Sequence, residues 1–210
     1  MPIHPDFPYP LYLVISEKDC VKMNWLQVAE EAIFGGVDII QLREKELSHT
    51  EYLNKAKALK KITDQYQIPL IINDAPEIAV EIQAWGVHVG LSDTQPLDIA
   101  EKYGDILKIG WSLEYQDQLE SPQMDPTHHL GLSPIFKTAT KTNTVTTWGI
   151  HGIQEIKLKT DKPLIAIGGM KQDNAGQAFQ AGANSIAVVS AICGSSDPRK
   201  AAELLKGLLK

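Results

Sequence analysis

The chain has 210 residues, of which 43% are hydrophobic and 22% are charged, and its formal net charge is −6. These are ordinary values for a globular protein, and the negative charge argues against wholesale binding to nucleic acid or to an anionic membrane. An anionic substrate would therefore need a local cluster of cations or a metal ion.

Short apolar runs rich in Ile, Val and Leu alternate with longer stretches of helical periodicity along the chain. The predicted strands are 11–15, 38–42, 69–72, 86–90, 106–112, 128–136, 163–167 and 185–190. The predicted helices are 25–34, 50–66, 76–85, a segment after 96, a weaker one at 115–119, and then 150–159, 174–180 and 198–209.

Strands as continuously apolar as these are typical of parallel sheets that are buried on both faces. Eight successive strand–helix units predict an α/β fold, a (β/α)8 TIM barrel. We expect one domain over residues 1–210, with residues 1–10 as a proline-rich N-terminal extension. The alternative is a doubly wound open sheet, which normally uses fewer strands.

Three further features favour a cytoplasmic protein. No apolar run approaches the roughly 20 residues that span a bilayer. The first ten residues lack the basic start and apolar core of a signal peptide. The two cysteines, Cys20 and Cys193, show no metal-ligand spacing and are expected to be reduced thiols.

Polar side chains gather where the predicted strands end, whereas turn residues precede the strands. In a (β/α)8 barrel the C-terminal ends of the strands form the face that carries the chemistry. The polar strand ends are Gln41, Arg43 and Lys45, then Asn73 and Asp74, then Asp93, Ser112, and the group Thr138, Ala139, Thr140 and Lys141. The sequence therefore predicts one site on one rim of the barrel.

The ends of the seventh and eighth strands predict a phosphate site. Gly168-Gly169 and Val189-Ser190 follow these strands, where free backbone amides and the helix dipole favour an anion. The alternative is a pair of tight turns that need glycine.

Asp74 and Asp93 follow adjacent strands, so their carboxylates can converge. Two carboxylates beside Asn73, without a His or Cys partner, suit a hard cation such as Mg²⁺. The alternative is that each aspartate caps a helix. Because Arg43 and Lys45 add two cations on the neighbouring strand, we expect a diphosphate to bind there.

These residues also carry a family resemblance, which covers residues 11–208. The chain resembles the thiamine-phosphate synthases, also called thiamine-phosphate pyrophosphorylases. The motifs are QLREK at 41–45, IIND at 71–74, GVHVG at 86–90 with Asp93, IGWS at 109–112, SPIFKTATK at 133–141, IAIGGM at 165–170 and IAVVSAI at 186–192. The resemblance implies a transferase of thiamine biosynthesis that requires Mg²⁺. Members join a hydroxymethylpyrimidine diphosphate to a hydroxyethylthiazole phosphate, and the products are thiamine phosphate and diphosphate.

The resemblance also implies a role for each matching residue. Asp74 and Asp93 would hold Mg²⁺. The pyrimidine diphosphate would bind at Gln41, Leu42, Arg43, Glu44, Lys45, Asn73 and Lys141, with Ser112 near the pyrimidine or its leaving group. The thiazole phosphate would bind at Thr138, Ala139, Thr140, Gly169, Val189 and Ser190. Arg43, Lys45, Ser112 and Lys141 would be the catalytic residues.

The expected mechanism is dissociative. The C–O bond to the diphosphate would break first, because the electron-rich aminopyrimidine stabilises the cation, and the thiazole nitrogen would then attack the methylene carbon. The cations would stabilise the departing charge. The polar stretch 138–147 is expected to close over the site and exclude water. No nucleic acid or membrane partner is expected, and homo-oligomer formation is left open.

Four departures from the family pattern leave alternatives open. They are Ala75 in place of Arg, Leu91-Ser92 before Asp93, Lys137 in place of Pro, and Leu113-Glu114 after Ser112. One alternative is a thiazole tautomerase, which shares the barrel and transfers a proton instead. The other is a barrel that binds thiamine precursors without catalysis. His88 is expected to pack or cap inside the barrel, and His128-His129 to lie at the surface.

Overall fold

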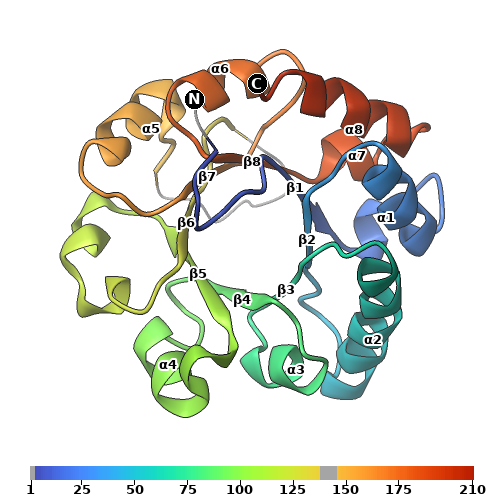
Figure 1. The fold of residues 1–210 in the computed structure, drawn as a ribbon, viewed down its shortest axis with the longest axis horizontal. Coiled ribbons are helices and arrows are strands. Elements are labelled where there is room, and N and C mark those ends of the chain that lie inside the picture. The colour runs from blue at the N-terminus through green and yellow to red at the C-terminus, as the bar shows by residue number, and fades with distance from the viewer. Residues whose placement is uncertain (1–2, 138–145) are drawn as a thin grey trace.

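The computed structural model describes residues 3–137 and 146–210, and its core is a closed barrel of eight parallel strands in chain order (Figure 1). The strands are β1 (Leu11–Ile15), β2 (Ile39–Leu42), β3 (Leu70–Asn73), β4 (Gly86–Val89), β5 (Lys108–Leu113), β6 (His129–Leu132), β7 (Leu164–Ile167) and β8 (Ser185–Val188). The strand β8 pairs with β1 and closes the barrel. The predicted (β/α)8 barrel is therefore confirmed.

Helices surround the barrel on its outside (Figure 1). They are α1 (Trp25–Phe34), α2 (His49–Gln65), α3 (Pro76–Glu81), α4 (Pro96–Tyr103), α5 (Gly149–Lys157), α6 (Ala175–Gln180), α7 (Ser190–Cys193) and α8 (Pro198–Gly207). Short 3-10 helices cover Glu17–Asp19, Gly104–Ile106, Gln116–Glu120 and Pro122–Met124. Ser48 and Glu51 form the capping box that begins α2, because the side chain of each residue accepts a hydrogen bond from the backbone amide of the other.

Several predicted elements have other bounds in the structure, and three of the differences concern the ends of β6 and β8 and the helix predicted at 115–119. The strand β6 ends at Leu132 rather than 136, and the chain beyond it turns so that Ile135 and Phe136 donate backbone hydrogen bonds to the carbonyls of Ile167 and Gly168. The strand β8 ends at Val188, because Ser190 already begins α7. The weak helix predicted at 115–119 is the 3-10 helix Gln116–Glu120.

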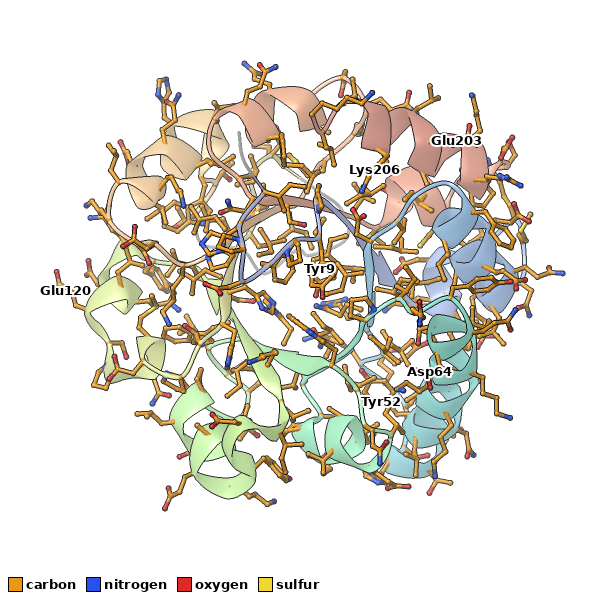
Figure 2. The ribbon with its side chains drawn as sticks, in the orientation of Figure 1. Tyr9, Tyr52, Asp64, Glu120, Glu203 and Lys206 are labelled. Atoms are coloured by element: carbon orange, nitrogen blue, oxygen red, sulfur yellow. The ribbon has the colours of Figure 1, made fainter. Side chains whose placement is uncertain are left out.

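Strand alternation divides the buried side chains into two cores. On β1, Leu11, Leu13 and Ile15 point outward and pack under the helices, whereas Tyr12 and Val14 point into the barrel. The inner core consists of Phe7, Tyr12, Val14, Ile39, Ile71, Ile165 and Ala187. In Figure 2 the side chains of Glu120 and Glu203 point away from the barrel at its periphery, and that of Tyr9 lies over the barrel opening.

The N-terminal segment closes the end of the barrel where the strands begin. It crosses the barrel opening in Figure 1, and Phe7 within it is fully buried. The Phe7 ring lies 5.2 Å from that of Tyr9, 5.9 Å from that of Trp85 and 4.9 Å from that of His129, measured between centroids. Residues 3–10 are thus part of the folded domain, and access to the interior is left to the opposite rim.

The prediction that His129 lies at the surface is wrong. The first residue of β6 is fully buried because its side chain points into the barrel, where it meets Phe7 and His88. Its neighbour His128 is only partly buried. Both cysteines are free thiols, as predicted. Within residues 3–137 and 146–210, every helix is too short or too polar to cross a bilayer.

Candidate active site

The strand β2 brings Gln41 into the barrel and turns Leu42 away from it. The Gln41 side chain is 5% exposed and donates a hydrogen bond of 2.6 Å from Nε2 to the Tyr12 hydroxyl. Leu42, predicted among the substrate-binding residues, is fully buried in the outer core. Because alternation sends it toward the helices, its side chain offers no surface to a ligand at the rim.

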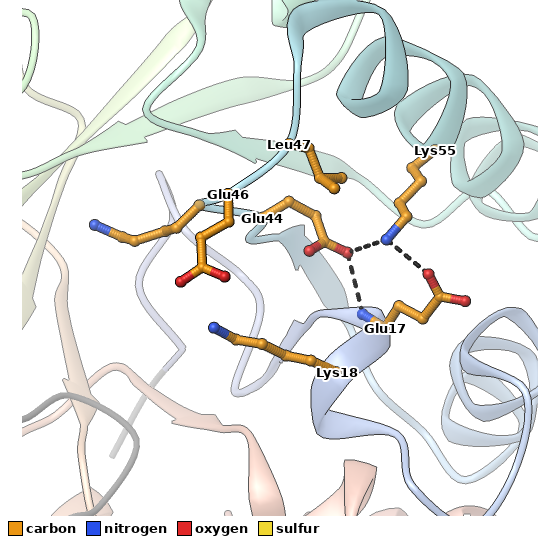
Figure 3. A pocket seen from close by; sticks show the side chains of 7 residues that line it. Glu17, Lys18, Glu44, Glu46, Leu47 and Lys55 are labelled. Carbon is orange, nitrogen blue, oxygen red and sulfur yellow. Dashed lines mark hydrogen bonds and ion pairs between the residues drawn. The ribbon is translucent and has the colours of Figure 1, made fainter.

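Glu44, predicted among the substrate-binding residues, makes an ion pair and a hydrogen bond within the protein. Its side chain is 7% exposed, and its Oε1 lies 2.8 Å from Lys55 Nζ and accepts a hydrogen bond of 3.1 Å from the Glu17 amide. Lys55 in turn pairs with the Glu17 carboxylate at 2.8 Å. Figure 3 shows this ion-pair group beside a pocket that Lys18, Lys45 and Glu46 also line. The Glu44 carboxylate therefore joins the β2–α2 loop to the β1–α1 loop.

Asp74 and Asp93 meet at the rim as predicted, with Lys45 beside them. Lys45 Nζ lies 3.5 Å from Asp74 Oδ2, and the Asp93 carboxyl group lies close enough to raise the pKa of Asp74. Asp93 Oδ2 also accepts a hydrogen bond of 2.9 Å from the Gly90 amide. Burial, followed by the charge of Asp93, raises the pKa of Asp74 to about 6, against the opposing effect of Lys45. Two carboxylates held this close repel each other when both are ionised.

This pair fits a divalent cation. Mg²⁺ usually takes one or two protein carboxylates and completes its shell with waters and substrate phosphates. The described residues contain no group of three or more His, Cys, Asp and Glu side chains that could hold a metal ion. The two carboxylates are a partial donor set, which would leave coordination positions for waters and phosphate oxygens.

Asn73 ends β3 with its side chain buried at 5% exposure. Within the described part of the chain, its Nδ2 has no hydrogen-bond partner. Its backbone is fixed by Tyr52, whose hydroxyl lies 3.0 Å from the Asn73 carbonyl and accepts from the Asn73 amide at 3.2 Å. The same hydroxyl lies 2.9 Å from the Leu42 carbonyl. Tyr52 thus joins the ends of β2 and β3, a role that the sequence analysis missed.

Ser112 lies on β5 and faces the barrel interior, where its Oγ lies 3.0 Å from His88 Nε2. His88 was predicted to pack or cap inside the barrel, and it lies there. Its contact with Ser112 was not predicted. Val87 and Val89 point outward, so strand alternation already indicated that His88 faces the barrel interior. The Ser112 carbonyl accepts a hydrogen bond of 2.9 Å from Gln118 Nε2.

The turn after β7 requires its two glycines. Gly168 and Gly169 have φ angles of 98° and 67°, which side chains rarely adopt. A Cβ on Gly169 would also stand 2.8 Å from Phe136 Cβ. Asn174 fixes this turn by donating from Nδ2 to the Gly169 carbonyl at 2.9 Å. The backbone of Gly169 is therefore held close to the chain that follows β6.

Val189 and Ser190 follow β8, where the short helix α7 begins. Val189 is partly buried and Ser190 is exposed. The predicted residues Thr138, Ala139, Thr140 and Lys141, and the proposed closing stretch that contains them, lie outside the described residues. Their predicted roles stay predictions.

A parallel (β/α)8 barrel with paired carboxylates, cations and a glycine turn at the C-terminal ends of its strands has the layout of a barrel enzyme for phosphorylated substrates. Comparison with known proteins is more specific. Residues 11–192 match the family model of thiamine monophosphate synthase, and the chain belongs to this family.

Curated relatives named thiamine-phosphate synthase match nearly the whole chain. The protein of Albidiferax ferrireducens is 39% identical, over 95% of this chain and 91% of its own. That of Vibrio parahaemolyticus is 40% identical, over 96% of this chain and 98% of its own. Among solved structures, thiamine phosphate pyrophosphorylase from Pyrococcus furiosus matches with a TM-score of 0.86 and 27% identity, over 96% and 95% of the two chains. The resemblance stated from the motifs is confirmed.

Proposed function

We propose that this protein is a thiamine-phosphate synthase, a transferase of thiamine biosynthesis that joins a hydroxymethylpyrimidine diphosphate to a hydroxyethylthiazole phosphate. The observation that carries the proposal is the Asp74–Asp93 pair beside Lys45, next to the side-chain Nδ2 of Asn73, which has no hydrogen-bond partner among the described residues. A diphosphate chelated to a cation would satisfy all of these groups. Its oxygens would accept hydrogen bonds from Asn73 Nδ2 and Lys45, and its cation would bind the two carboxylates.

Asp74 and Asp93 would hold Mg²⁺, and the bound ion would supply positive charge to the leaving diphosphate. Arg43 and Lys45 follow Gln41 at the end of β2 and would hold the diphosphate oxygens from that side. Arg43 is anchored through its backbone, since its amide donates to the Ile15 carbonyl at 2.9 Å. Fixed cations of this kind stabilise charge that develops as the bond breaks.

The chemistry that these groups support is dissociative. The C–O bond breaks, its electron pair leaves with the diphosphate, and a pyrimidine-stabilised cation remains. The thiazole nitrogen then donates its lone pair to the methylene carbon. Ser112, which faces the barrel interior, would lie at the base of the site near the reacting pyrimidine. The backbone amides of Gly169, Val189 and Ser190 would orient the thiazole phosphate on the opposite side of the rim.

The test is turnover with both substrates and Mg²⁺, followed through diphosphate release. Arg43→Ala should lower kcat/KM at least 100-fold, an effect typical of a lost transition-state contact. Arg199→Ala is the matched control, because this side chain is 54% exposed on α8, where it pairs with Glu203. A tautomerase or a binding protein would release no diphosphate under these conditions, and that result would overturn the proposal.

A further inference from the structure

A pair of histidines lies inside the barrel, below the proposed site. The rings of His88 on β4 and His129 on β6 are stacked, with centroids 5.7 Å apart and planes 30° from parallel. His88 makes contact upward with Ser112, where Nε2 and Oγ are 3.0 Å apart. His129 is held from below by Phe7, whose ring centroid lies 4.9 Å away. The interior therefore contains a continuous column from Phe7 to Ser112.

Two glycines make room for this column. Gly110 lies opposite both histidines in the strand register, and a Cβ there would stand 2.1 Å from His129 Nε2 and 2.5 Å from His88 Nδ1. Gly131 pairs with Ser112, and a Cβ on it would stand 3.0 Å from His88 Cε1. The His88 ring is thus confined between the glycine strands and the His129 ring. Removal of His129 would open one wall of this slot.

His129 acts as a neutral ring. It is fully buried, and burial, followed by the charges of His88 and His128, holds its pKa well below the usual value. Neither ring nitrogen has a hydrogen-bond partner within the described residues. A buried polar atom without a partner normally destabilises a protein, so a purely apolar ring would pack here at lower cost. The contribution of His129 to the column is its flat shape against His88.

We propose that His129 is a positioning residue of the synthase: its ring supports His88, which in turn holds the Ser112 hydroxyl in one orientation at the base of the active site. This inference rests on the proposed role of Ser112 in the reaction. On this proposal the functional site includes a residue below the rim, His129, which acts through His88 without contact with the substrate.

The experiment compares His129→Leu with His129→Phe, since both are apolar and only Phe keeps a flat ring. Steady-state kcat and KM would be measured for both substrates. We expect His129→Leu to lower kcat about 3- to 10-fold, the range for loss of one neutral hydrogen bond, with KM changed less than about 2-fold. His129→Phe should keep kcat within about 2-fold of the wild type.

A double-mutant cycle separates positioning from general structural damage. In a Ser112→Ala background, His129→Leu should cause no further fall in kcat, because the column no longer has a hydroxyl to orient. Equal losses in both backgrounds, or a His129→Phe variant as slow as His129→Leu, would overturn the inference. Gly131→Ala presses on His88 from the other side and replaces His129→Leu if that variant does not fold.

The distance between His88 and Ser112 tests the positioning role of His129 independently of enzymatic activity. In a crystal structure of His129→Leu, or of Gly131→Ala, we expect His88 Nε2 to lie beyond hydrogen-bond distance of Ser112 Oγ. An unchanged hydrogen bond would refute the positioning role whether or not activity falls. Absence of diphosphate release by the wild type would instead refute the proposed function.

Discussion

Replacement of Asp74 by Asn should stabilise the protein in the absence of metal and remove its activity. The pKa of Asp74 rises from 3.8 to about 6, mainly through burial and then through the charge of Asp93. One pKa unit corresponds to about 1.4 kcal/mol, so ionisation of Asp74 costs the folded state up to about 3 kcal/mol. The side chain is 25% exposed, and solvent screening brings our expectation to about 1–3 kcal/mol.

The pH dependence follows from the sign of this shift. Above pH 6 the carboxylate is ionised in both the folded and the unfolded chain, and the folded chain bears the penalty. As the pH falls from 6 toward 4, the folded protein binds the proton first, and the penalty disappears. Asp74→Asn should therefore exceed the wild type in free energy of unfolding at pH 7.5, and the difference should vanish near pH 4. Asn also tolerates the left-handed φ of 61° at this position.

Urea unfolding in EDTA at several pH values measures this difference. The control is Asp173→Asn, an exposed aspartate after β7, which should change the free energy of unfolding little at either pH. Added Mg²⁺ should stabilise the wild type at pH 7.5 through its preference for the folded state, and should stabilise Asp74→Asn less. If Asp74→Asn is no more stable than the wild type at pH 7.5, or is equally favoured at pH 4, the electrostatic reasoning fails.

Three further predictions concern residues in different parts of the barrel. Glu44→Gln should leave kcat/KM within about 2-fold of the wild type. It should lower the free energy of unfolding by about 1–3 kcal/mol, since Lys55 and the Glu17 amide lose a buried carboxylate partner. A fall in activity as large as that of Arg43→Ala would contradict this. Phe7→Ala should cost about 3–5 kcal/mol in urea unfolding, the usual penalty for a fully buried aromatic ring, with KM for both substrates unchanged in the folded fraction. Gly169→Ala should raise KM for the thiazole phosphate at least 10-fold, because its φ is 67° and the added Cβ meets Phe136, and an unaltered KM would place that phosphate elsewhere.

The barrel and its functional rim could be predicted because both follow from order along the chain. Eight apolar runs in parallel strands leave few topologies, and the polar residues that end the strands must then share one rim. This reasoning brought Asp74 and Asp93 together without any knowledge of distances. It also located Gly168-Gly169, whose positive φ angles explain the glycines.

The individual roles within QLREK could not be read from the motif. The motif alone does not show which of its five side chains face the rim. In the structure, strand alternation buries Leu42 under the helices and turns Gln41 toward Tyr12. Glu44 forms an ion pair with Lys55 in the next helix, and no local sequence pattern predicts this pair. The position of His129 was predictable in principle, because it lies two residues before Gly131 on one face of the same strand.

Four polar residues near the rim fall into two groups according to their interactions in the free protein. The side chains of Glu44 and Tyr52 are largely buried and hydrogen-bonded, and they join neighbouring loops and strands. Asn73, with an unpartnered Nδ2 among the described residues, and Asp74, with a raised pKa, each make the free protein less stable than an alternative residue would. Both lie where a chelated diphosphate would remove the cost. We therefore expect Asn73 and Asp74 to act on the substrate, and Glu44 and Tyr52 to hold the rim in shape.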